Sequence, residues 1–260
     1  MTEQKTAGFV GGGRVTRIIL GGLKKAGRMP ARVVASDTNP DVLKRLQSGF
    51  PDVQTVPNNN REAAAQDLVF LALHPPALAG SLAEIKDSLK PEAIVISLAP
   101  KLSIAGIAGG LDGFRRIVRL IPNAASIMGE GYNPIVFSEA LRPRDKGAIE
   151  SLLSALGKCP EVAEDKLEAY AVITAMGPTY LWFQLRELRN LAESFGMAAE
   201  EAETGVAEMA AGAVRTLFGS GMPAEEVLDL IPVKPLAEDE AGITAAYRAR
   251  LEPLYKKLRS

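Results

Sequence analysis

Short runs of apolar residues recur along the first half of the chain, and most are followed by a stretch with helical periodicity. The runs predict strands at Thr6–Val10, Ala31–Ser36, Val53–Val56, Asp67–Leu73, Ala93–Leu98 and Arg116–Leu120. Strands that are apolar on both faces and alternate with helices form parallel sheets that helices cover on both sides. Since the crossovers between such strands are right-handed, we predict an α/β fold that begins with a doubly wound sheet.

The second half of the chain has a different pattern, because strand-like runs fade from about Asp145 and helical periodicity takes over. The predicted helices span Asp165–Ala175, Thr179–Phe195, Ala198–Phe218, Ala224–Asp229 and Ala241–Lys257. We therefore expect two domains, a sheet domain at residues 1–158 and an all-helical domain at residues 159–260.

Charge and cysteine content argue against several classes of protein. The 30 basic and 31 acidic residues give a net charge of −1, so we expect neither nucleic acid nor an anionic membrane as a partner. The polar N-terminus lacks the apolar stretch of a signal peptide, and no apolar run is long enough to span a membrane. One cysteine, Cys159, and one histidine offer neither an internal disulfide nor a metal-ligand cluster. We expect a cytoplasmic protein without a metal.

A glycine triplet, Gly11–Gly13, stands between the first predicted strand and a predicted helix at Arg14–Ala26. In the dinucleotide-binding pattern G-x-G-x-x-[G/A], Gly11 allows the tight turn and Gly13 lets the backbone approach a pyrophosphate. The helix N-terminus adds free N–H donors and a partial positive charge. The order of strand, glycines and helix predicts that the sheet domain is a Rossmann-type dinucleotide-binding domain.

Residues beyond the triplet complete the predicted cofactor site. Thr16 takes the third position of the pattern, where a smaller residue is usual, and the loop runs on into Arg14 and Val15. Asp37 ends the second predicted strand, where it would bond an adenosine ribose hydroxyl and repel a 2′-phosphate. The alternative is an ordinary glycine turn in which Asp37 caps the next helix. The choice between NADP and NAD stays open, since Arg14 offers a cation in the glycine loop.

Four segments follow one another along the chain at a recognisable spacing. They are Gly8–Gly13, Asp67–Leu73 with Pro75, Arg119–Ala125 followed by Gly129-Glu130-Gly131, and Gly177–Tyr180. They are similar, in this order, to the opening loop, the fourth strand, the R-x-M-P-N-x-P stretch and the S-G-P-A-Y helix start of the pyrroline-5-carboxylate reductase family. The resemblance runs through most of residues 5–230.

The resemblance implies a Rossmann domain followed by a helical domain through which two copies form a homodimer. It implies hydride transfer from NADPH, with NADH as the alternative, to the C=N bond of a small cyclic imino acid, as in proline biosynthesis. Besides the glycine loop and Asp37, the cofactor contacts that we expect are Asn59, Leu73, His74, Pro75 and Asn123. We assign catalytic roles to Asn123, which would sit beside the nicotinamide, and to Thr174. The hydroxyl that faces the substrate would be that of Thr174 or that of Tyr180.

The substrate loop departs from the family's pattern. Where the family has T-S-P-G-G-T-T, this chain has Ile231-Pro232-Val233-Lys234-Pro235-Leu236, without glycines or hydroxyls, and Met176 replaces the family's serine. Lys234 either anchors the substrate as a point charge, which would make it a third catalytic residue, or is a solvated loop lysine. Three functions stay open: reduction of the family's imino acid, reduction of another imine or carbonyl compound, or regulatory dinucleotide binding without turnover.

Overall fold

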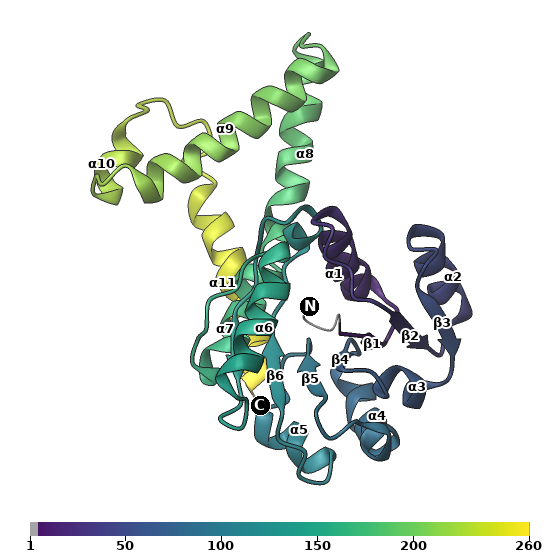
Figure 1. The fold of residues 1–260 in the computed structure, drawn as a ribbon. Coiled ribbons are helices and arrows are strands. Elements are labelled where there is room, and N and C mark those ends of the chain that lie inside the picture. Colours follow the sequence, from purple (N-terminus) through teal and green to yellow (C-terminus); the bar gives the residue numbers. More distant parts are fainter. Residues whose placement is uncertain (1–4, 260) are drawn as a thin grey trace. The chain divides into compact units, whose positions relative to one another are not determined.

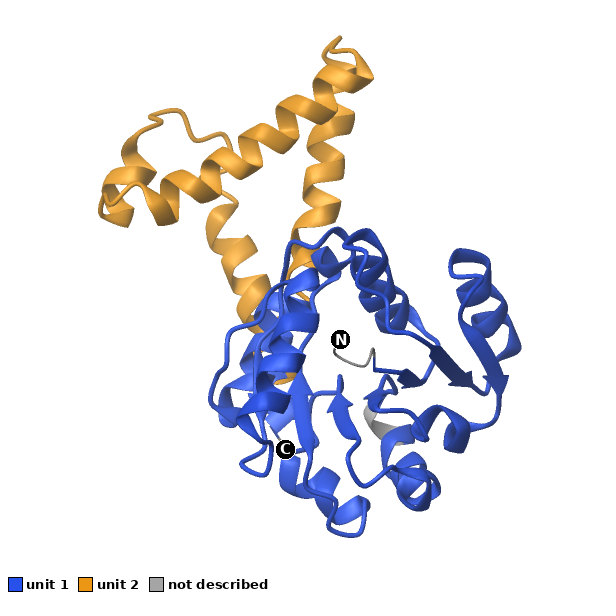
Figure 2. Ribbon diagram, viewed as in Figure 1, with its two compact units in different colours: residues 1–175, 255–260 blue, residues 176–254 orange. Residues whose placement is uncertain are grey.

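The computed structural model describes residues 5–259, apart from the side chains of Pro75 and Pro76. The chain forms two compact units, coloured separately in Figure 2. Unit 1 comprises residues 1–175 and 255–260 and contains the sheet, while unit 2 comprises residues 176–254 and is helical. Residues 159–175, which we assigned to the helical domain, belong to unit 1.

A seven-stranded sheet forms the centre of unit 1, with the strand order β3-β2-β1-β4-β5-β6-β8 (Figure 1). The strands are β1 (Ala7–Val10), β2 (Val33–Asp37), β3 (Gln54–Pro57), β4 (Leu68–Leu71), β5 (Ile94–Ser97), β6 (Ile117–Leu120) and β8 (Ile135–Phe137). Strands β1 to β6 are parallel, and β8 runs antiparallel to β6. The chain order reverses between β1 and β4, and sheets of this kind bind ligands at that switch point, beyond the carboxyl ends of the strands.

Helices cover both faces of the sheet, which confirms the predicted doubly wound fold. Side chains of α1 and α6 pack into one core, and side chains of α3, α4 and α5 pack into the other. The helices of unit 1 are α1 (Arg14–Lys25), α2 (Pro40–Gly49), α3 (Asn60–Ala64), α4 (Pro75–Ile85), α5 (Ile104–Gly110), α6 (Pro143–Leu153) and α7 (Leu167–Tyr170). The short 3-10 helices are η1 (Lys86–Ser88), η2 (Ala124–Met128), η3 (Ser154–Leu156) and η4 (Glu164–Lys166), and β7 (Gly131–Tyr132) pairs with β9 (Gly157–Lys158) in a second small sheet.

Alternate residues of the central strands enter opposite cores. Phe9 and Phe70 stack in one core with their ring centroids 4.5 Å apart, while Val10 and Leu71 pack into the other. All four side chains are fully buried. Because both faces of these strands are buried, each strand reads in the sequence as a continuous apolar run.

Two parts of unit 1 differ from what we predicted. Strand β8 and helix α6 lie in a stretch for which we predicted no element, and the 160–162 segment hydrogen-bonds to the outer side of β8. The helix predicted over 165–175 is instead η4, α7 and a π-helical segment, η5 (Ala171–Ala175). Three consecutive β-branched residues crowd an α-helical turn there, and the Thr174 hydroxyl donates to the carbonyl of Tyr170 at 2.8 Å.

Unit 2 consists of α8 (Pro178–Ser194), α9 (Ala199–Gly219), α10 (Ala224–Asp229) and most of α11 (Glu240–Arg259). Helices α8 and α9 are joined by a turn in which Gly196 has a φ of 96°. The ring of Tyr180 meets that of Tyr247 edge-on, with centroids 6.1 Å apart. No helix between residues 5 and 259 combines the length and the hydropathy that a membrane span requires.

Asp67 ties the first strand to the fourth at their amino ends. Its carboxylate accepts hydrogen bonds from the backbone N–H and the hydroxyl of Thr6, both at 2.9 Å, and pairs with Lys90 at 2.7 Å. Burial raises the pKa of this carboxyl group, but the hydrogen bonds and the charge of Lys90 outweigh burial and lower the pKa from 3.8 to about 2.

We expect Asp67→Asn to lower the free energy of unfolding by about 1 kcal/mol at neutral pH, a value reduced for solvent screening of a side chain that is 34% exposed. Because the folded pKa lies below the unfolded value, this contribution is complete above about pH 5 and is lost as the pH falls through 3.8 toward about 2. Urea unfolding of both proteins across this range measures the difference, and a difference independent of pH would contradict the assignment.

Candidate cofactor-binding site

The glycine loop follows β1 at the switch point of the sheet. Gly11 has a φ of 104°, and a Cβ atom on it would lie 2.5 Å from the carbonyl oxygen of Ala72. Its N–H donates to the carbonyl of Ser36 at 2.8 Å. Both the left-handed backbone and the close approach require glycine here.

Gly13 leaves the start of α1 open. It is the N-cap residue, with a φ of −73° and a ψ of −155°, and among the described residues no side chain caps the helix. A Cβ atom on Gly13 would meet nothing within 4 Å, and the first turn carries no acidic residue. Free N–H groups, a helix dipole and open space are what a pyrophosphate group requires, so these residues fit a dinucleotide.

The structure explains why Thr16 is accepted at the third position of the glycine pattern, where a smaller residue is usual. Its side chain is fully buried, and its hydroxyl donates to the carbonyl of Gly11 at 2.6 Å. The hydroxyl of Thr16, which glycine or alanine would lack, therefore ties the glycine loop to the first turn of α1.

Asp37 also holds the loop. One carboxylate oxygen accepts from the N–H of Gly12 at 2.9 Å, and the other accepts from the N–H of Asn39 at 2.9 Å. The N-cap of α2 is Asn39, whose side chain accepts from the N–H of Asp41. Asp37 is thus not the cap of the next helix, and it stands beside the glycine loop at the end of β2.

The other predicted cofactor contacts lie on turns, or at the starts of helices, that follow neighbouring strands. Leu73 is close to the loop, since a Cβ atom on Gly11 would lie 3.2 Å from its Cδ2 atom. His74 is exposed at the N-cap of α4, and the side chain of Pro75 lies outside the described residues. Asn59 caps α3 by accepting from the N–H of Glu62 at 3.2 Å. Arg14, which is exposed, and Val15, which is half-buried, are the first two residues of α1.

Asn123 and Thr174 lie together beyond β6. The amide nitrogen of Asn123 donates to the carbonyl of Thr174 at 2.7 Å, and its amide oxygen accepts from the N–H of Ala125 at 2.8 Å. Asn133, which we did not predict, is fully buried and accepts from the backbone N–H of Asn123 at 2.9 Å. The two predicted catalytic residues of unit 1 are therefore in direct contact, although Thr174 contributes its carbonyl and not its hydroxyl.

An ion-pair cluster that we did not predict holds together the segments that lead to Asn123 and Thr174. Arg119 in β6 is 2% exposed and donates to Glu164 at 3.0 Å and to Glu168 at 2.7 Å. The same carboxylates accept from the backbone N–H groups of Ile104 and Lys101. The cluster binds the chain before Thr174 to the strand before Asn123. The sequence signal for this cluster is an arginine inside an apolar strand, because a buried charge needs a partner of opposite charge.

Lys234, the third predicted catalytic residue, lies in unit 2. It is exposed, on the stretch between α10 and α11. Its role as a substrate anchor stays a prediction. Within residues 5–259, no group of three or more histidine, cysteine or carboxylate side chains is arranged to hold a metal ion.

Known proteins resemble the chain over nearly its whole length. Residues 6–101 match the family model described as NADP oxidoreductase coenzyme F420-dependent. The pyrroline-5-carboxylate reductase of Methanosarcina acetivorans is 27% identical over 253 residues, which cover 94% of this chain and 93% of that protein. The enzyme of the same name from Escherichia coli is 23% identical and covers 88% of this chain and 85% of its own.

Solved structures that are similar to this chain carry the same enzyme name as these relatives. A pyrroline-5-carboxylate reductase from Coxiella burnetii is 28% identical, with a TM-score of 0.69 over 100% of this chain and 95% of that one. The Plasmodium falciparum pyrroline carboxylate reductase with NADP bound has the same fold, with 20% identity and a TM-score of 0.83 over 100% of this chain and 98% of that one.

The fold and the glycine loop define the class as proteins with a Rossmann-type dinucleotide-binding sheet followed by a helical region. Within that class, the chain is similar over most of its length to pyrroline-5-carboxylate reductases. The resemblance that we drew from the glycine loop, the Pro-Asn segment and the Gly-Pro helix start is confirmed.

Proposed function

We propose that the protein is an NADPH-dependent reductase, with NADH as the alternative donor, that acts on the C=N bond of a small cyclic imino acid. The observation that carries the proposal is the open start of α1 at the switch point of the sheet. It is supported by near full-length relatives that are named pyrroline-5-carboxylate reductases and by a solved neighbour that binds NADP. The bound cofactor would supply the hydride, while the protein positions it against the imine carbon.

In this proposal, Gly11 and Gly13 form the pyrophosphate cradle and Asp37 meets the adenosine ribose. Asn123 would meet the nicotinamide amide, because an asparagine amide has two N–H donors and two lone pairs. One donor is used on Thr174 and one lone pair on Ala125, so donor and acceptor capacity remains for a ligand. The contact with Thr174 fixes the orientation of that amide.

The test is to mix the purified protein with NADPH or NADH and to follow absorbance of the reduced nicotinamide with a panel of substrates. Turnover of pyrroline-5-carboxylate is the expected result. Turnover only of another imine or a ketone would support the second function, which the altered loop around Lys234 motivates. Cofactor binding without turnover of any candidate would overturn the reductase assignment in favour of a regulatory role.

Asp37 should set the choice between the two cofactors. We expect Asp37→Asn to raise affinity for NADPH relative to NADH by about tenfold, because it removes the charge that repels the 2′-phosphate. Asparagine keeps an acceptor for the N–H of Gly12, so the loop stays formed. The control is Asp41→Asn, an exposed acid on α2. An unchanged ratio of the two dissociation constants would place the ribose elsewhere.

We further propose that two copies form a homodimer through the helices of unit 2. Large apolar side chains are exposed on those helices or directly after them, namely Leu181, Trp182, Phe183, Leu188, Leu191, Phe195, Met209, Val214 and Phe218. Faces of this kind mark protein contacts. Sedimentation at micromolar concentration tests the proposal, and a monomer would overturn it. A cytoplasmic location stays a prediction.

A further inference from the structure

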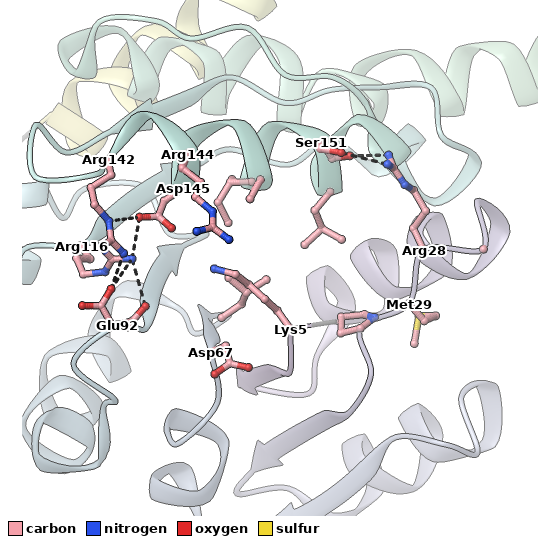
Figure 3. Close-up of a pocket in the computed structure, with 16 residues that line it drawn as sticks. Lys5, Arg28, Met29, Asp67, Glu92, Arg116, Arg142, Arg144, Asp145 and Ser151 are labelled. Carbon is pink, nitrogen blue, oxygen red and sulfur yellow. Dashed lines mark hydrogen bonds and ion pairs between the residues drawn. The ribbon is translucent and has the colours of Figure 1, made fainter. Parts of the chain in front are cut away.

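A cavity of about 1350 Å³ opens in unit 1 at the amino ends of the strands (Figure 3). Lys5 precedes β1, Asp67 precedes β4 and Arg116 precedes β6, while Gly27–Pro30 and α6 form other parts of the wall. Since the strands are parallel, this edge of the sheet is opposite the carboxyl edge that carries the glycine loop. The cavity therefore shares no residue with the cofactor site.

Most of the charges that line the cavity are already paired. Arg116 and Arg142 share Asp145, at 3.1 and 2.9 Å, and both also pair with Glu92. The third acid, Asp67, is neutralised by Lys90, which is not part of the lining. Five cationic side chains line the cavity against these three acids, so the wall carries excess positive charge.

The excess resides on Lys5, Arg28 and Arg144. Among residues 5–259, no carboxylate lies within 4.0 Å of any of the three. Among the described residues, Arg28 donates only to the uncharged oxygens of Ser151 and Ser154. Figure 3 shows the charged ends of Lys5 and Arg144 pointing into the cavity, without a dashed line to either. Cations from three separate segments thus line one cavity, and none of the three has a carboxylate partner among residues 5–259.

We propose that this cavity binds a small molecule that carries two or more negative charges on phosphate or carboxylate groups. A multiply charged anion would supply the partner that these cations lack, and guanidinium groups bind both kinds of oxyanion through charge-assisted hydrogen bonds. The volume is ample for a compact organic anion. A nucleic acid is disfavoured, because the chain has a net charge of −1 and the cations line a hollow instead of a stripe.

Titration calorimetry with pyrophosphate and with citrate, at matched ionic strength, tests the proposal. The full chain is used with Gly13→Asp, which is expected to block the glycine loop, and separately with the loop saturated by NADPH. We expect saturable binding of at least one probe in both backgrounds. The preferred probe identifies phosphate or carboxylate as the recognised group. Because the Gly13→Asp background needs no cofactor, failure of the reductase proposal leaves this test intact.

The variants Arg144→Gln and Lys5→Gln test whether the probe binds in this cavity, by the change in its dissociation constant. Each is expected to weaken binding about fivefold to tenfold, and the double variant more, because each removes one charge-assisted contact. Lys166→Gln is the matched control, since Lys166 is exposed and lies outside the cavity lining. Absence of saturable binding of both probes, or equal binding by the wild type and the double variant, would overturn the proposal.

Discussion

Replacing Gly13 with aspartate is expected to weaken NADPH binding at least about 100-fold, or about 2.8 kcal/mol, while the chain stays folded. A Cβ atom at this position meets nothing within 4 Å, and its φ of −73° suits any residue. The new carboxylate would stand before the free N–H groups of α1, where it would repel a pyrophosphate and occupy its donors.

The same substitution should not destabilise the protein. Aspartate is a better N-cap than glycine by a few tenths of a kcal/mol, so the midpoint of urea unfolding should stay the same or rise slightly. Calorimetric titration of the variant with NADPH measures the loss of affinity. Gly80→Asp is the control, because Gly80 is exposed on α4 and also has open space around it. Retention of cofactor affinity in Gly13→Asp would mean that the pyrophosphate binds elsewhere.

Arg119→Met is expected to lower the free energy of unfolding by about 3–5 kcal/mol, since it leaves a buried carboxylate without its partner. Glu168 is 10% exposed and lies 2.7 Å from the guanidinium group. The change is measured by urea unfolding. The more exposed pair Arg32–Glu62, 3.6 Å apart, gives the comparison, because Arg32→Met should cost less than about 1 kcal/mol.

A second variant separates the lost charge pairing from a general packing defect. Arg119→Met combined with Glu168→Gln removes the more buried of the two carboxylates that lose their partner. Glutamine still offers an acceptor to the N–H of Lys101. We expect the double variant to recover more than half of the lost stability. If it is no more stable than Arg119→Met alone, the methionine packs badly and the ion pair is not the reason for the loss.

The parts of this protein that sequence could predict are those fixed by local pattern. The buried strands, the glycine loop and Asp37 at the end of β2 each follow from neighbours within a few residues. Thr16 shows the limit of such a pattern, because its size argued against the site until its hydroxyl was found to bond the carbonyl of Gly11.

The parts that sequence could not predict depend on partners far along the chain. The acids that pair with Arg119 stand 45 and 49 residues away, and no spacing rule connects them to it. The sequence around Asn133 likewise indicates only a loop, whereas in the structure its side chain accepts from the N–H of Asn123. Strand β8 has only three residues and pairs antiparallel, so its pattern is too short to distinguish from loop. The partnership of Asn123 with Thr174 spans 51 residues.

The two margins of the large sheet have a consequence for how the protein avoids aggregation. At one margin, β3 ends in Pro57, which has no N–H to offer a neighbour. At the other margin, β8 has no further strand beside it among residues 5–259, but the outward backbone groups of Ile135 are already paired. The N–H of Ile135 donates to the carbonyl of Pro160, and its carbonyl accepts from the N–H of Val162. Strand addition by another molecule is therefore hindered at both margins, which protects the folded chain from growing into fibrils through this sheet.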